Sequence, residues 1–142
     1  MFNYTNALIR NISSSFANAI CSTEPLIPIN INKAIRQHEI YTDNIKNLVN
    51  ACHVIDSDEN CPDCVFVEDT CVIIGNRVLI TNPGHATRKD EICKVKDYLM
   101  KLGLEIFQMP NDCTLDGGDV LITNKEIFVG ISSRTNVEGG DF

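Results

Sequence analysis

Residues 65–81 read VFVEDTCVIIGNRVLIT, two largely apolar runs separated by Gly75-Asn76. Both runs are rich in Val and Ile, which favour strands, and a Gly-Asn pair between two such runs is typical of a two-residue hairpin turn. The stretch therefore predicts a β-hairpin formed by residues 65–74 and 77–81. This hairpin decides the fold, because predicted strands and helices in a similar order precede and follow it in the sequence.

A helix and a strand follow this hairpin. Thr87 is predicted to cap a helix that ends at Gly103, because a hydroxyl suits the first position and glycine commonly follows the last turn. Residues 104–109 then predict a strand, and residues 119–123 and 127–131 predict a second hairpin. The unit is hairpin, helix, strand.

The same order extends towards the amino end. Residues 7–10 and 52–55 predict strands on either side of a helix that begins at Ile31 and runs to about Ala51. The pattern recurs after roughly fifty residues, which is typical of a repeat array. The fold class expected is therefore α+β.

The last copy of the unit is expected to be incomplete. Arg134-Thr135-Asn136 resembles the predicted helix start at Thr87-Arg88, yet no helix or closing strand is expected before Phe142. We interpret this as truncation. An array that stops part way exposes strand edges, so marginal solubility is expected.

Composition narrows the class of protein. The 142 residues are expected to form one domain, residues 1–142. A net charge of -7 argues against nucleic acid as a partner, and the lack of a long apolar run argues against a membrane span. Residues 1–6 lack a secretory signal, so a cytoplasmic location is expected, with the seven cysteines present as thiols.

Three carboxylates, Asp63, Glu68 and Asp69, lie in an otherwise apolar segment. Acids on a hydrophobic strand need a cation or ligand to compensate them, which makes the cluster a candidate site. The alternative is structural: strand alternation would place Glu68 and Asp69 on opposite faces, one solvated and the other paired with an internal arginine.

Two arginines, Arg88 and Arg134, follow successive hairpins at equivalent positions. If the copies are related by rotation, their guanidinium groups converge and could bind a carboxylate by bidentate hydrogen bonds; the alternative is a solvated surface position. Acids and arginines together indicate a pocket for an amino acid that carries a guanidinium side chain.

Other motifs carry weaker signals. The run from Asp116 to Asp119, with two central glycines, is consistent with a turn, and no phosphate-binding glycine pattern accompanies it. Cys61 and Cys64 have a metal-type spacing but lack a matching second pair, so buried thiols are favoured. No metal, no cofactor and no Cys-His catalytic pair are predicted.

Four segments in register resemble the dimethylarginine dimethylaminohydrolase family. They are CPDCVFVEDTCVI, LITNPGHATRKDE, TLDGGDVLIT and FVGISSRTN, and NALIR and IRQHEIY agree with them. The resemblance covers nearly the whole chain but only about the amino-terminal half of the family's length. It implies a pentein fold of five strand-strand-helix-strand modules, of which about two and a half are expected here in a partial α/β propeller.

The resemblance also implies an activity. The family hydrolyses methylated arginines to citrulline and a methylamine, which affects nitric oxide signalling, and uses a cysteine nucleophile and a histidine. By motif, the substrate-binding residues would be Asp63, Glu68, Asp69, Arg88 and Arg134, with the arginines receiving the α-carboxylate. The cysteine and histidine are expected beyond Phe142, so these 142 residues alone are predicted to be inactive.

Two alternatives remain open at this point. One is a related pentein, an arginine or agmatine deiminase, which shares the guanidinium chemistry. The other is a non-catalytic fragment that acts as a binding module. The sequence favours no oligomeric state.

Overall fold

The computed structural model describes residues 4–23 and 25–142. Residues 1–3, the start of the segment considered for a secretory signal, lie outside the described residues. The chain divides into two compact units, an amino-terminal unit that ends at Val65 and a carboxy-terminal unit of residues 66–142. Both contain helices and strands, so the predicted mixture of α and β structure is confirmed. The single-domain assignment stays a prediction.

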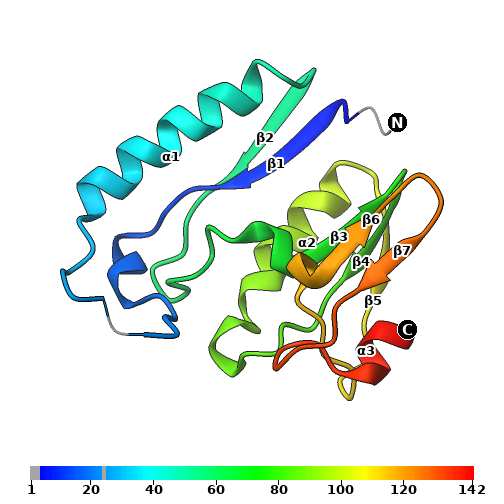
Figure 1. Cartoon of the computed structure of the whole chain (residues 1–142). Coiled ribbons are helices and arrows are strands. Elements are labelled where there is room, and N and C mark those ends of the chain that lie inside the picture. Colours follow the sequence, from blue (N-terminus) through cyan, green and yellow to red (C-terminus); the bar gives the residue numbers. More distant parts are fainter. Residues whose placement is uncertain (1–3, 24) are drawn as a thin grey trace. The chain divides into compact units, whose positions relative to one another are not determined.

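The amino-terminal unit is a strand-helix-strand arrangement (Figure 1). Strands β1 and β2 pair in parallel, with Asn6 opposite Ala51 and Arg10 opposite Ile55. A parallel pair needs a crossover connection, which helix α1 supplies. The elements of this unit are β1 (Asn6–Arg10), the 3₁₀ helix η1 (Ser14–Asn18), α1 (Ile31–Lys46) and β2 (Ala51–Ile55).

Helix α1 is shorter than predicted. It begins at Ile31 as expected but ends at Lys46, five residues before the predicted end at about Ala51. The backbone amides of Asn50 and Ala51 donate to the carbonyl of Thr5, at 2.8 and 3.2 Å, and so lead the chain into β2. These strand-side hydrogen bonds outweigh the weak helical preference of the asparagines that follow Lys46.

The central hairpin of the carboxy-terminal unit is confirmed, with Gly75-Asn76 at its turn. Strands β3 and β4 are antiparallel, and β5 pairs in parallel with β4 after helix α2 (Figure 1). The predicted order of hairpin, helix and strand is therefore present. The bounds are β3 (Cys71–Ile74), β4 (Arg77–Ile80), α2 (Glu91–Lys101) and β5 (Glu105–Gln108).

A second hairpin follows, as predicted, and consists of β6 (Val120–Ile122) and β7 (Ile127–Val129). A five-residue helix, α3 (Val137–Asp141), comes after it and is red in Figure 1. Asn136 caps this helix, because its side-chain oxygen accepts a hydrogen bond from the Gly139 amide at 2.8 Å. The expectation that no helix follows Asn136 was wrong.

The first predicted strand of the central hairpin begins too early. A 3₁₀ helix, η2 (Val67–Thr70), replaces its first part, so β3 starts only at Cys71. The Thr70 hydroxyl donates to the Val67 carbonyl at 2.7 Å and closes this turn. Glu68 and Asp69 therefore do not alternate across a strand, and that part of the structural alternative was wrong.

Helix α2 also begins later than predicted. A 3₁₀ turn, η3 (Ala86–Arg88), precedes it, and Thr87 lies inside this turn rather than capping the helix. His85 stabilises the turn, since its carbonyl accepts from the Arg88 amide at 3.0 Å. The predicted end is confirmed, because α2 stops just before Gly103.

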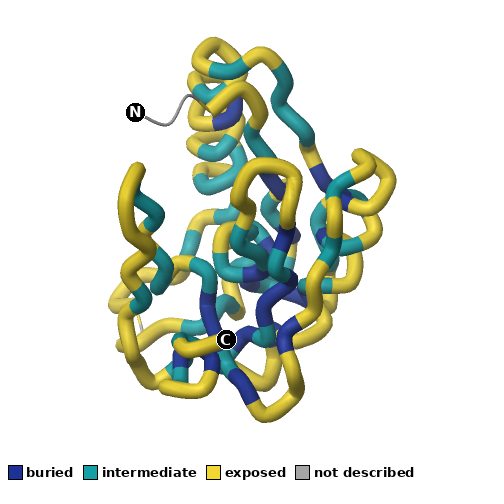
Figure 2. The backbone as a smooth tube through the Cα atoms, turned by 90° about the vertical axis from the view of Figure 1, so that its right-hand side faces the viewer, coloured by how far each residue is buried: buried dark blue, intermediate teal, exposed yellow. Residues whose placement is uncertain are grey.

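The buried residues of the carboxy-terminal unit join α2 to the strands. Val95 and Leu99 of α2 are buried, and Met109, Cys113 and Leu115 form a cluster with partly buried residues of β3, β4, β6 and β7. Figure 2 shows the buried stretches of the backbone in dark blue among intermediate and exposed segments. No helix among the described residues is both long and apolar enough to cross a membrane.

Candidate substrate-binding site

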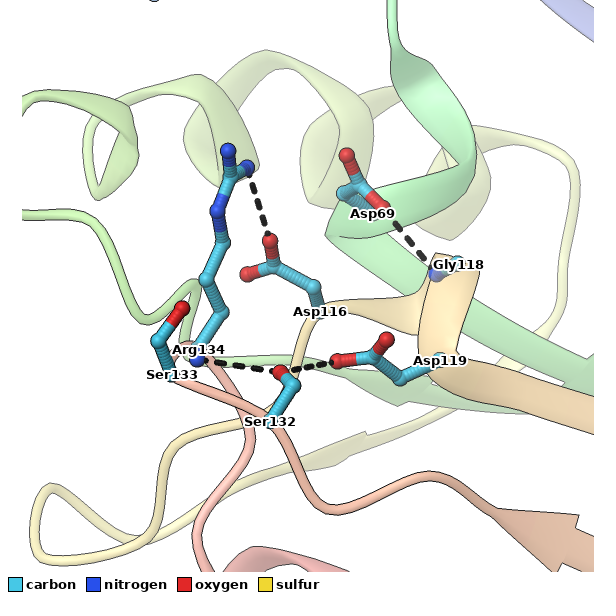
Figure 3. A pocket seen from close by; sticks show the side chains of 7 residues that line it. All are labelled: Asp69, Asp116, Gly118, Asp119, Ser132, Ser133 and Arg134. Carbon is cyan, nitrogen blue, oxygen red and sulfur yellow. Dashed lines mark hydrogen bonds and ion pairs between the residues drawn. The ribbon is translucent and has the colours of Figure 1, made fainter. Parts of the chain in front are cut away.

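The carboxy-terminal unit contains a cavity of about 400 Å³ (Figure 3). Three segments contribute to it: η2, the 3₁₀ helix η4 (Gly117–Asp119) with the residue before it, and the loop after β7. The lining residues are Asp69, Asp116, Gly118, Asp119, Ser132, Ser133 and Arg134.

Asp69 enters the cavity from η2. Its Oδ1 accepts a hydrogen bond from the Gly118 amide at 3.0 Å, and its Oδ2 accepts one from Nη1 of Arg88. Gly117 allows η2 and η4 to approach this closely, because a Cβ atom there would overlap the carbonyl oxygen of Glu68. The Asp69 carboxylate is thus held by two donors and keeps acceptor capacity for a ligand.

Arg88 lies behind Asp69 and is only 1% exposed. Its Nε and Nη2 donate to the Glu91 carboxylate, and Nη2 also donates to the Phe66 carbonyl at 3.0 Å. Burial alone would lower the pKa of Arg88, but the hydrogen bonds that it donates to the Glu91 and Asp69 carboxylates raise the pKa above its usual value. This guanidinium is therefore permanently charged.

Arg134 faces the cavity and is paired with Asp116. The distance between Nη1 of Arg134 and Oδ2 of Asp116 is 3.2 Å, and the arginine side chain is 38% exposed against 6% for the aspartate. The Gly84 amide donates to the other oxygen of Asp116 at 2.9 Å. Gly84 is required here, since a Cβ atom would overlap the backbone of Arg134.

Asp119 holds the loop after β7 in place. Its Oδ2 accepts hydrogen bonds from the hydroxyls of Ser132, at 2.8 Å, and Thr135, at 2.6 Å. The Ser132 hydroxyl oxygen in turn accepts from the Arg134 amide at 3.0 Å, as Figure 3 shows. The backbone of Arg134 is thereby fixed relative to η4.

The charges lining the cavity do not balance. Three carboxylates, Asp69, Asp116 and Asp119, face one guanidinium, that of Arg134, which leaves a net charge of -2. Arg88 and Glu91 behind the cavity cancel each other and do not change this sum. The site therefore favours a ligand with a cationic group, while Arg134 is available to a carboxylate.

The sequence model of the family described as "N,N dimethylarginine dimethylhydrolase, eukaryotic" matches residues 9–141. The chain belongs to the dimethylarginine dimethylaminohydrolase family. This agrees with the resemblance carried by the four sequence segments.

Individual relatives agree with this family. DDAH2 of Bos taurus is 34% identical over 139 residues, covering 96% of this chain and 49% of the relative. The dimethylarginine dimethylaminohydrolase of Streptomyces coelicolor is 33% identical over 133 residues, covering 94% and 52%. The chain thus spans about half the length of the curated relatives it matches.

A solved structure of the family superimposes closely. It is a variant of the Pseudomonas aeruginosa dimethylarginine dimethylaminohydrolase complexed with citrulline, with a TM-score of 0.92 and 25% identity. The match covers 99% of this chain and 55% of that one. The fold described above is therefore that of the corresponding part of a dimethylarginine dimethylaminohydrolase.

Two of the residues predicted from the family motifs, Asp69 and Arg134, line the same cavity. Arg88 contacts Asp69 but is not among the lining residues, and Glu68 lies next to Asp69 on η2. Asp63 belongs to the amino-terminal unit, where it is buried and both its oxygens accept from the Ile20 amide, at 3.0 and 3.2 Å. The substrate-binding role of all five stays a prediction.

Sequence reasoning missed other residues that line or support the cavity. Asp116 and Asp119 were assigned only to a turn, although two acids beside two glycines were visible in the sequence. Glu91 was not considered, yet it lies three residues after Arg88, where side chains on one helical face meet. Ser132 left no signal that distinguishes it from an ordinary loop serine.

We expect Gly84→Ala to destabilise the protein by about 2 kcal/mol, because the added methyl group must displace the backbone of Arg134. Urea unfolding of the carboxy-terminal unit measures the loss. Gly130→Ala is the matched control, since a Cβ atom there comes no nearer than 3.6 Å to Asp119. Equal stability of the two variants would contradict the close approach.

The ionisation of Glu68 is expected to cost folding free energy. Desolvation, with a smaller contribution from the charge of Asp69, raises the pKa of Glu68, although its side chain is exposed. The folded state then holds a proton more tightly than the unfolded chain, so stability falls as the pH rises through the window between the ordinary and the raised pKa.

Replacing Glu68 by Gln removes this penalty. The stability of Glu68→Gln relative to wild type should therefore increase as the pH rises through and above the ordinary pKa of a glutamate, measured by urea unfolding at each pH. Glu126→Gln, at an exposed turn residue, is the control. A difference between Glu68→Gln and wild type that does not change with pH would contradict the raised pKa.

Proposed function

We propose that this chain forms the substrate-binding part of a hydrolase that converts N-omega-methylated arginines to citrulline and a methylamine. The observation that carries the proposal is one cavity that combines Asp69 and Arg134 with a net charge of -2. A methylarginine has a cationic head and a carboxylate at opposite ends, which suits this distribution. Citrulline bound to the Pseudomonas aeruginosa relative supports a ligand of the same shape.

In this proposal the acids bind the guanidinium group and Arg134 binds the other end of the substrate, whereas Arg88, which the family motif also assigns to the α-carboxylate, has a supporting role. Asp69 has acceptor capacity on the cavity side, and Glu68, its neighbour on η2, is a further acid assigned by family motif. Arg134 receives the α-carboxylate, because a planar guanidinium can bind a carboxylate through two parallel hydrogen bonds. Arg88 supports the site from behind Asp69.

The chemical step needs a reactive thiolate, which we propose lies with a histidine in residues that follow Phe142. Two cysteines of this chain are unsuited to the role. Burial raises the pKa of Cys71 to about 11, and it also raises the pKa of Cys113. A thiol that stays protonated near neutral pH is a poor nucleophile.

The family relationship also supports proposals about the complete fold, the location and the physiological effect of the protein. The hairpin, helix and strand units would be about two and a half of the five modules of a pentein propeller. The protein would act in the cytoplasm on free methylated arginine, without metal or cofactor. Removal of methylated arginines would affect nitric oxide signalling.

Citrulline formation tests the proposal. We expect none from residues 1–142 alone, and turnover of dimethylarginine by the protein extended through the residues that follow Phe142. Asp69→Asn in the extended protein should raise the KM for dimethylarginine roughly ten- to hundred-fold, because a charge-assisted contact is lost. Asp97→Asn, at an exposed position on α2, is the matched control.

The same assay separates the alternatives. Arginine and agmatine are supplied in place of dimethylarginine, and citrulline or carbamoyl product is measured. Preference for arginine or agmatine would replace our assignment with a deiminase. Binding of methylarginine without turnover by the extended protein would favour a binding module. Activity from residues 1–142 alone would refute the proposal that the reacting cysteine and histidine lie after Phe142.

A further inference from the structure

Glu91 is a fully buried acid, with 0% of its surface exposed, at the first residue of α2. Three hydrogen bonds from Arg88 reach its carboxylate: Nε donates to Oε1 at 3.2 Å and to Oε2 at 3.1 Å, and Nη2 donates to Oε2 at 2.8 Å. A buried carboxylate is costly unless it is paired in this way. Glu91 therefore fixes one edge of the Arg88 guanidinium.

The other edge of the same guanidinium holds η2. Nη1 of Arg88 donates to Oδ2 of Asp69, and Nη2 donates to the carbonyl of Phe66. Four of the five N–H groups of Arg88 are thus committed to Glu91, Asp69 and Phe66. Because the guanidinium is planar and rigid, a change in the position of Glu91 is passed on to the donor that holds Oδ2 of Asp69.

Charge adds a second effect to this geometry. Arg88 lies between two carboxylates, and Glu91 neutralises it, so that Asp69 keeps its negative charge towards the cavity. Without the charge of Glu91, Arg88 and Asp69 would form a neutral pair. Asp69 would then attract a cationic ligand much less strongly.

We propose that Glu91 is a positioning residue that makes the site selective for a cationic ligand, by holding Arg88 so that Asp69 faces the cavity with its charge uncompensated. The inference rests on the proposed function for the identity of the ligand. Its link from Glu91 to Asp69 rests only on the described contacts.

Glu91→Gln in the full-length protein tests the selectivity. Competitive binding of dimethylarginine, a cation, and citrulline, which has a neutral side chain, is measured at neutral pH. We expect affinity for dimethylarginine to fall about tenfold and that for citrulline to fall far less, as for contacts coupled within one network. If Glu91 had a merely structural role, the affinities for both ligands would fall equally, and that result would overturn the proposal.

Two further variants guard against a trivial loss of folding. Glu91→Asp retains the charge and should recover most of the preference for dimethylarginine; a loss as large as that of Glu91→Gln would contradict the proposal. In an Asp69→Asn background, Glu91→Gln should have little further effect on ligand preference. Glu105→Gln is the matched control, because Glu105 forms an exposed ion pair with Arg77 in the same unit.

A measurement without ligand separates this inference from the proposed function. The Gly118 amide donates to Asp69, so its NMR resonance reports the position of that carboxylate. We expect Glu91→Gln to shift this resonance and Glu105→Gln to leave it unchanged. An unshifted resonance in Glu91→Gln would refute the positioning role, whereas a wild-type protein that binds neither ligand would refute the proposed function alone.

Discussion

The buried guanidinium of Arg88 is the group on which the carboxy-terminal unit depends. It joins α2, through Glu91, to η2, through Asp69 and the Phe66 carbonyl. Removing one partner of such a buried pair typically costs about 3–5 kcal/mol, because the remaining charge is left uncompensated. This one cation therefore ties the start of η2 to the start of α2.

The same network extends into the cavity without interruption. The Gly118 amide connects Asp69 to η4, and Asp119 at the end of η4 binds the hydroxyls of Ser132 and Thr135. The loop that carries Arg134 is thus fixed by backbone and side-chain hydrogen bonds. A site whose groups are already held in place loses little entropy when a ligand binds, which favours affinity for a small molecule with charged groups at both ends.

Local signals were sufficient for much of the fold. The Gly75-Asn76 turn, both hairpins and the end of α2 depend on short-range propensities that one sequence contains. Element η2 was predicted as part of a strand because Val65 and Val67 favour strands, whereas a tertiary hydrogen bond from Arg88 to the Phe66 carbonyl stabilises its actual 3₁₀ conformation. Tertiary interactions of this kind override propensity and cannot be inferred from neighbouring residues.

For the site, the family motifs predicted which acids and arginines lie near the cavity better than they predicted which ion pairs these residues form. Asp69 and Arg134 do share a cavity, but Asp116, the ion-pair partner of Arg134 in the structure, was not among the predicted site residues. The pairing of Arg88 with Asp69 matches part of the structural alternative, in which one acid binds an internal arginine. The packing of η2, η4 and α2 decides which carboxylate pairs with which arginine.

A crystal structure of the full-length protein with dimethylarginine bound would test the account most directly. We predict the guanidinium group beside Asp69, the α-carboxylate beside Arg134, and Arg88 still bound to both Glu91 and Asp69. A complex in which Arg88 leaves Glu91 to bind the α-carboxylate, or in which the ligand lies away from Asp69, would contradict the account.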